Sequence, residues 1–198
     1  SLTLLGDLAQ GTAPWAATDW AQTLVHLGKP AARVVPLTLG FRVPGAVLEL
    51  ANRLLPALAV DVPAARSLRH DGWLAVRQVS DVDSSVPAAV REALELEGSV
   101  AVIAAEGSAQ RLASALDRAG IPNSGAEQQA RVTVLPATLA KGLEYDHVIV
   151  VEPAEIVDAE PRGLHRLYVV LTRAVSRLAV LHTRPLPGPL SPPTAQLH

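Results

Sequence analysis

The chain of 198 residues contains no cysteine and no methionine, and only 3% of its residues are aromatic. Without cysteine it has neither disulfides nor thiolate metal sites, which suits the cytoplasm, where we expect the protein to work. Without methionine it lacks a translation start of its own, so we interpret it as a piece of a longer protein. With so few aromatic side chains, its core must be aliphatic.

Charges and long apolar runs are also scarce. Charged residues make up 18% of the chain and the formal net charge is −2, so indiscriminate electrostatic binding to nucleic acid is not expected. No apolar run approaches the length of a membrane span, and no basic region followed by an apolar core opens the chain. We therefore predict no membrane segment. The six histidines show no metal-ligand spacing, so we also predict no metal site.

Strand-like and helix-like segments alternate along the chain. The strand-like segments are 2–7, 33–41, 73–79, 99–105, 131–137, 147–153 and 177–183. The helix-like segments are 18–27, 43–58, 84–97, 108–120 and 163–176, and 60–72 reads as a loop. The alternation predicts an α/β fold with a mainly parallel sheet flanked by helices. No G-x-G-x-x-G follows a strand, so a dinucleotide-binding fold is not favoured.

Polar residues follow several of these strands, and they fall into short stretches. The stretches are GDLAQ (6–10), Trp15, GFRVP (40–44), LAKGLEYD (139–146) and LYVVLTRA (167–174). Because ligands of parallel sheets gather beyond the carboxyl ends of the strands, we expect the functional site at that edge.

Each stretch alone also has an ordinary structural explanation. Asp7 could form a turn, Arg42 could be a solvated surface group, and Lys141 with Gly142 could be a plain turn. Arg173 could complement a helix dipole, and Trp15 could be a core or partner contact.

Taken together and in this order, the stretches resemble the later motifs of superfamily 1 helicases of the UvrD/Rep type. G-D-x-x-Q resembles motif III, the Phe-Arg pair motif IV, A-K-G-L-E motif V and Y-V-x-x-T-R-A motif VI. The resemblance runs from residue 2 to about 183. It implies a RecA-like fold and a share in an ATP-dependent DNA helicase or translocase.

The resemblance also implies catalytic roles. Arg173 and Arg42 correspond to two arginines that bind the γ-phosphate of ATP, a task that suits the always-charged, planar guanidinium. Gln10 corresponds to the residue that senses the γ-phosphate and reports it to the DNA track.

Further residues correspond to binding positions. Phe41 would stack on the adenine, Glu144 would lie near the nucleotide sugar, and Gly142 would allow close approach of the backbone. Asp7 joins this nucleotide-binding set. A second set is implied on the nucleic-acid side, where Trp15 would stack on single-stranded bases; it comprises Trp15, Thr138 and Lys141.

Two parts of an ATP site are missing. The chain has no G-x-x-x-x-G-K-[ST] and no Asp-Glu dipeptide. The residues that bind the phosphates of ATP and its Mg²⁺ are therefore expected in an upstream RecA-like domain. That domain would be the first partner of this chain. We therefore expect the end of the first domain at 1–30, the second domain at 31–183, and a disordered Pro-rich tail at 184–198. Alone, this fragment should not hydrolyse ATP.

Departures from the family pattern leave alternatives open. Pro136 and Thr138 stand where motif V usually has Thr and His, which removes expected contacts to the DNA backbone. The sequence LPATLAKGLEYD resembles instead the HelD branch (helicase IV-like), some members of which release stalled RNA polymerase. Polymerase is therefore a second possible partner beside single-stranded DNA. A third reading is a non-catalytic RecA-like interaction module, against which Arg42, Glu144 and Arg173 argue.

Overall fold

Five parallel strands form the main sheet of the computed structural model, which describes residues 2–126 and 130–191. The spatial order is β3–β7–β6–β4–β5. The strands are β3 (Trp73–Gln78), β4 (Val100–Ala104), β5 (Val132–Pro136), β6 (Tyr145–Val151) and β7 (Ala174–His182). A separate parallel pair joins β1 (Leu39–Gly40) and β2 (Arg66–Ser67). The predicted α/β fold with a parallel sheet is confirmed.

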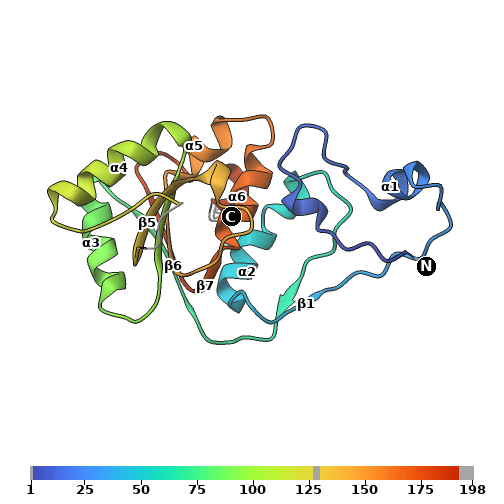
Figure 1. The fold of residues 1–198 in the computed structure, drawn as a ribbon, viewed down its shortest axis with the longest axis horizontal. Helices are drawn as coiled ribbons and strands as arrows, with labels where there is room; N and C mark the ends of the chain where they lie inside the picture. Colours follow the sequence, from blue (N-terminus) through green and yellow to red (C-terminus); the bar gives the residue numbers. More distant parts are fainter. Residues whose placement is uncertain (1, 127–129, 192–198) are drawn as a thin grey trace, which may run out of the picture.

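Helices cover both faces of this sheet, with α3 and α4 on one face and α2, α5 and α6 on the other (Figure 1). The α-helices are α1 (Trp20–His26), α2 (Gly45–Asn52), α3 (Val82–Leu94), α4 (Glu106–Arg118), α5 (Pro153–Asp158) and α6 (Gly163–Leu171). Single 3-10 turns are η1 (Leu8–Gln10), η2 (Leu55–Ala57), η3 (Ala137–Leu139) and η4 (Gly188–Leu190). Across the described ranges, no helix has the length and apolarity that crossing a membrane requires.

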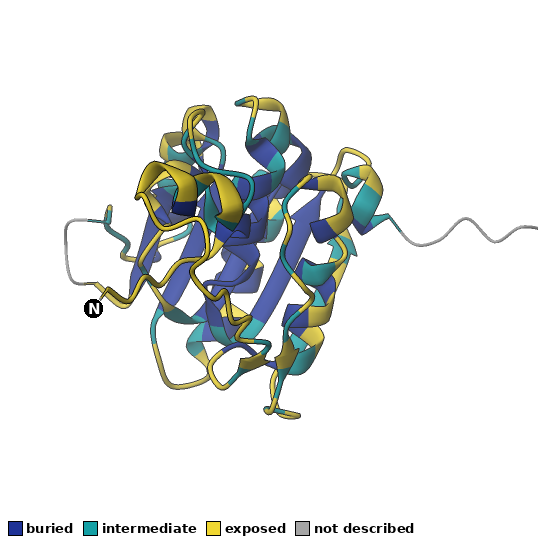
Figure 2. Ribbon diagram, turned by 90° about the vertical axis from the view of Figure 1, so that its right-hand side faces the viewer, coloured by how far each residue is buried: buried dark blue, intermediate teal, exposed yellow. Residues whose placement is uncertain are grey.

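The core is split by the sheet into two layers. Along β4, Ala101 and Ile103 face the layer of α2 and α6, while Val100, Val102 and Ala104 face the layer of α3 and α4. All five are fully buried. Figure 2 shows the strands at the centre of the molecule in the dark blue of buried residues. A strand covered on both faces requires an unbroken apolar run, which is why this strand could be predicted from the sequence.

Helix α3 begins earlier than predicted. Its cap is Asp81, whose carboxylate accepts the backbone N–H groups of Asp83 and Ser84. A capping carboxylate satisfies amides that the helix leaves unpaired, so the first turn closes at Val82.

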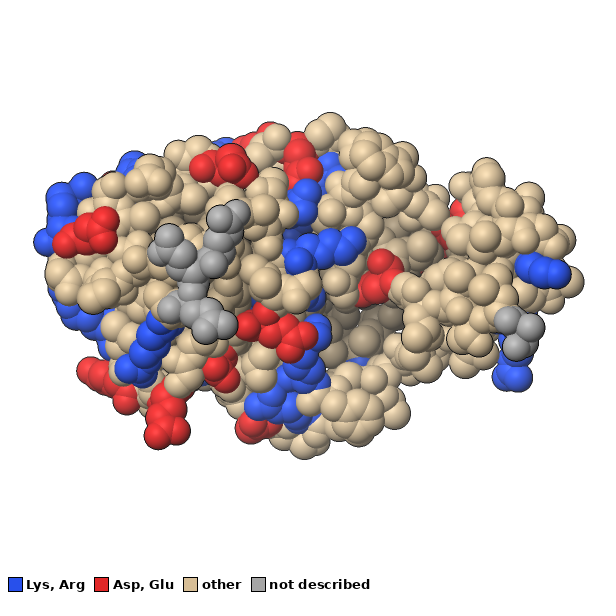
Figure 3. Space-filling view, in the orientation of Figure 1, with Lys and Arg blue, Asp and Glu red and all other residues tan. Residues whose placement is uncertain are grey.

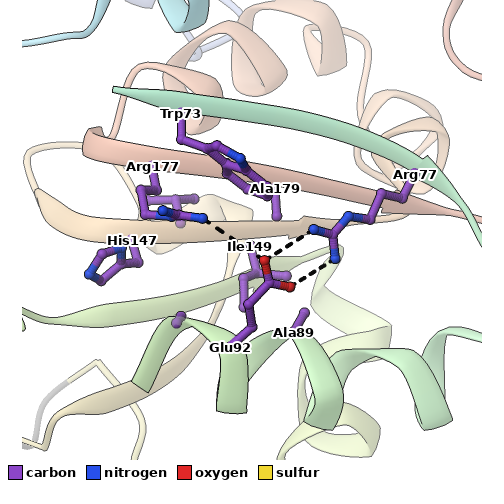
Figure 4. A pocket seen from close by; sticks show the side chains of 10 residues that line it. Trp73, Arg77, Ala89, Glu92, His147, Ile149, Arg177 and Ala179 are labelled. Carbon is purple, nitrogen blue, oxygen red and sulfur yellow. Dashed lines mark hydrogen bonds and ion pairs between the residues drawn. The ribbon is translucent and has the colours of Figure 1, made fainter. Parts of the chain in front are cut away.

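A cluster of polar side chains lies between α3 and the sheet, near the start of β3 (Figure 4). Arg77 binds both oxygens of Glu92 at 3.0 and 3.2 Å, and the guanidinium of Arg177 lies 4.2 Å from the ring centre of Trp73. The Arg77 hydrogen bonds lower the pKa of the Glu92 carboxyl. The half-open hollow of about 20 Å³ beside it has room for a water molecule and not for a ligand, so this cluster is structural.

The N-terminal part departs most from prediction. Residues 2–7 form no strand, and the predicted strand 33–41 is reduced to the two residues of β1. The loop predicted at 60–72 contains β2. Eleven of the fifteen exposed large apolar side chains in the described part of the chain belong to residues 2–41. Figure 3 shows this end of the molecule as a surface with only isolated charges.

The predicted disorder from residue 184 is wrong for residues 184–191. Leu190 in η4 is buried in the core, and the Ser191 carbonyl accepts a hydrogen bond of 2.6 Å from Arg53. Leu186 packs against the same core, and Arg184 binds Asp158, so several contacts to the rest of the domain hold this segment in place. Residues 192–198, the remainder of the predicted tail, lie outside the described residues.

Candidate functional site

Arg173 lies at the centre of the candidate site, in the turn between α6 and β7. It is 3% exposed. Its Nε donates to the Val169 carbonyl at 2.9 Å, its Nη1 to the Leu143 carbonyl at 3.3 Å, and its Nη2 to Oε1 of Gln10 at 3.4 Å. One guanidinium thus joins α6, the turn before β6 and the N-terminal segment.

A half-exposed ion pair between Arg42 and Glu144 lies beside Arg173. Burial and, after it, the charge of Arg42 lower the pKa of Arg173, while the charges of Glu144 and Asp7 act in the opposite direction. A guanidinium stays charged in proteins because its ordinary pKa is so high. The site therefore holds two cations close together, with Glu144 paired to Arg42 and Asp7 acting on Arg173.

Gln10 connects these groups to the N-terminal segment. Its Nε2 donates to Oδ2 of Asp7 at 2.8 Å, and its backbone carbonyl accepts from Nζ of Lys141 at 2.9 Å. Asp7 also caps η1 by accepting the Ala9 N–H at 3.0 Å. The amide side chain of Gln10 therefore lies between a carboxylate and the buried Arg173, with its orientation fixed by both.

The connection 137–144 runs from the carboxyl end of β5 to the amino end of β6. Thr138 consequently lies beyond the carboxyl ends of the strands, while Glu144 lies at their amino ends, next to Arg173. The expectation that the whole site gathers at the carboxyl edge is therefore wrong: the arginine cluster lies at the amino ends of β6 and β7. Gly142 has a φ of +86°, a conformation that glycine adopts without strain.

Two aromatic candidates present their rings to solvent. Phe41 is 72% exposed and directly precedes Arg42, while Trp15 is 86% exposed in the loop after η1. Exposed aromatic rings are suited to stacking on planar ligands. Phe41 is thus adjacent to the arginine cluster, and Trp15 lies in a different loop.

Thr138 is already engaged by a carboxylate. Its hydroxyl donates to Oε2 of Glu106, the first residue of α4, at 2.7 Å. Glu106 received no role from the sequence, because an acidic residue in the first turn of a helix is ordinary.

The structure brings six of the predicted site residues into one network: Asp7, Gln10, Arg42, Lys141, Glu144 and Arg173. Gly142 and Phe41 adjoin it, whereas Trp15 and Thr138 lie apart from it in the hydrogen bonds of the described residues. Sequence reasoning gave no separate role to Tyr168 of the LYVVLTRA stretch, whose pKa is raised to about 12, first by burial and then by the charge of Asp7. It also missed Arg162, which binds the Trp15 loop.

Comparison with known proteins gives the fold and no more. No protein-family model and no curated protein matches the chain. Among solved structures, the chain is similar to the C-terminal domain of a possible DNA helicase from Lactobacillus plantarum WCFS1, with 21% identity and a TM-score of 0.57. The match covers 77% of this chain and 92% of that one. The five-stranded parallel sheet with helices on both faces is thus a fold that this chain shares with a helicase C-terminal domain.

Proposed function

We propose that this chain is the second RecA-like domain of an ATP-driven motor that acts on DNA. In this role it supplies Arg42, Arg173 and Gln10 to ATP held mainly by an upstream RecA-like domain. The observation that carries the proposal is the convergence of three remote segments, those of Gln10, Arg42 and Glu144, on Arg173. Gln10 is 163 positions from Arg173 and Arg42 is 102 positions from Glu144, yet their polar groups meet at one edge of the sheet.

The donor set suits the phosphates of a nucleotide. Two clustered guanidinium groups can stabilise the charge that develops on a transferring phosphoryl group. The carboxylates of Asp7 and Glu144 are engaged by Gln10 and Arg42, so they do not offer a site for Mg²⁺. The metal that accompanies ATP would be held by the upstream domain and would neutralise phosphate charge there.

The apolar N-terminal surface supports a docked neighbour. Leu2, Leu4 and Leu5 are exposed along an extended segment without strand partners in the described chain. They help to line a groove of about 820 Å³, whose other lining residues include Trp20, residues 32–37 and Tyr168. An isolated domain rarely leaves so much contiguous apolar surface in water, so we assign this surface to the upstream domain.

A specific observation favours a second candidate, a HelD-like ATPase that releases RNA polymerase. Glu106 binds the hydroxyl of Thr138, where the helicase reading places a contact to the DNA backbone. A carboxylate there repels phosphate. The non-catalytic module is less favoured, because a module without nucleotide would not require a buried Arg173 beside a second arginine.

ATP hydrolysis by the full-length protein, with and without single-stranded DNA, tests the proposal. For a DNA motor we expect strong stimulation by DNA.

Glu106→Gln should tighten DNA binding about fivefold at low salt, since one repulsive charge pair at a solvated contact costs about 1 kcal/mol. Glu95→Gln, an exposed change directly after α3, is the control. Hydrolysis that ignores DNA in every variant would favour the polymerase candidate, and absence of hydrolysis would favour the non-catalytic module.

A further inference from the structure

Arg162 binds the loop that carries Trp15 at two points. This arginine directly precedes α6, and its Nη1 donates to the Gly11 carbonyl at 2.5 Å. Its Nη2 donates to the Ala16 carbonyl at 3.0 Å. A planar guanidinium with fixed donors can bridge two acceptors at once, which a lysine ammonium on a flexible stem does less well. The two ends of the loop are thereby drawn to one side chain.

The loop is also tightly closed. A Cβ atom on Gly11 would lie 2.9 Å from Cβ of Ala16 and 3.2 Å from Nη1 of Arg162. Thr12 is 8% exposed beneath the loop, while Trp15 at its tip is 86% exposed. The loop therefore holds its aromatic tip outward, and a side chain at position 11 would force Ala16 and Arg162 to shift.

The support of Arg162 is itself rigid. A Cβ on Gly163 would lie 1.9 Å from the Val157 carbonyl, so α5 touches the first turn of α6. At the other end of α6, Arg173 reaches the side chain of Gln10, the neighbour of Gly11. Two arginines that flank the same helix thus hold adjacent residues of the N-terminal segment.

We propose that Arg162 is a positioning residue that fixes the Trp15 loop on α6, so that Trp15 and Gln10 move as one unit with the helix. The clamp rests on the contacts above, whereas its effect on nucleic acid rests on the proposed function. A change at the nucleotide would then be transmitted through Arg173 and Gln10 and would move the Trp15 ring directly.

Hydrogen exchange on the 198-residue chain tests the clamp alone. In Arg162→Ala, the amides of residues 11–17 should exchange at least tenfold faster, while those of β4 keep their protection. Arg162→Lys should restore part of the protection. Arg166→Ala is the matched control, since its guanidinium binds Glu160 in the turn before α6 and the Thr138 carbonyl, and not the Trp15 loop. Unchanged exchange at 11–17 in Arg162→Ala would overturn the clamp.

Binding of fluorescent oligothymidylate to the full-length protein tests the consequence. We expect Arg162→Ala and Trp15→Ala each to weaken binding about tenfold, and the double variant to bind no worse than either. Additive losses in the double variant would show that Arg162 does not act through Trp15. If Trp15→Ala leaves affinity unchanged, the nucleic-acid role of Trp15 fails, while the exchange result still decides the clamp.

Discussion

Replacing Arg173 with alanine in the full-length protein should lower the ATP hydrolysis rate by about 10³-fold or more. An arginine that stabilises the charge on the transferred phosphoryl group contributes this much in related chemistry. Arg173→Lys should recover only a small part of the rate, because an ammonium keeps the charge and loses the planar fork. Steady-state hydrolysis at saturating ATP is the measurement.

A structural effect must be separated from this catalytic effect. Arg173 is buried and donates to the carbonyls of Val169 and Leu143, so its removal should also cost about 1–3 kcal/mol of folding free energy. Urea unfolding of each variant therefore accompanies the kinetics, and Arg118→Ala, an exposed change on α4, serves as the control. A folded Arg173→Ala protein that hydrolyses ATP within threefold of the wild-type rate would refute the role of Arg173.

Two helical glycines should respond to alanine with opposite signs. In Gly163→Ala the new Cβ meets the backbone oxygen of Val157 at 1.9 Å, and backbone cannot rotate away as a flexible side chain can. We expect a loss of about 3 kcal/mol or more, at the upper end of overpacking costs. Gly107, in the first turn of α4, has open space around it, so Gly107→Ala should stabilise by about 0.5–1 kcal/mol.

Urea unfolding of the 198-residue chain checks this pair. Both changes add one methyl group near a helix N-terminus, so differences in helix propensity cancel in the comparison. Equal midpoints for the two variants would show that α5 does not approach α6 as closely as described. A destabilised Gly163→Ala variant should also lose protection in the Trp15 loop, because Arg162 directly precedes this glycine.

The central strands were predictable from the sequence, and the point where α6 ends was not. The apolar run around β4 has one stable solution, a strand covered on both faces. Periodicity extended α6 to residue 176, but the helix ends at Leu171. There the Thr172 hydroxyl and the Arg173 Nε both donate to the Val169 carbonyl, and the chain continues into β7. Such side-chain bonds to backbone carbonyls carry no periodic signal.

The residues of the candidate site could be listed from short motifs, but their arrangement could not. The spacing of the motifs along the sequence does not show that Gln10 and Arg173, which are separated by most of the chain, come into contact. The path of residues 137–144 across the sheet, which separates Thr138 from Glu144, depends on strand order, and strand order is set by the packing of whole helices. Arg162 was missed because its two partners are backbone carbonyls, which every residue has.

The boundary predicted between residues 30 and 31 stays a prediction, but the packing of the N-terminal segment bears on how the two parts are joined. Leu8 and Ala9 are buried against the second part, and both arginines that flank α6 reach this segment. If the prediction holds, a segment of the first domain packs on the second and is well placed to transmit a change between them.

Photolabelling with an azido derivative of ATP would test the central claim, that this chain forms one wall of an ATP site, most directly. The full-length protein is irradiated with the probe, digested with trypsin and analysed by mass spectrometry. We predict label on the peptide of residues 34–42, which contains Phe41, with the label lost in excess ATP and in Phe41→Ala. Label confined to other peptides, with residues 34–42 unmodified, would contradict the claim.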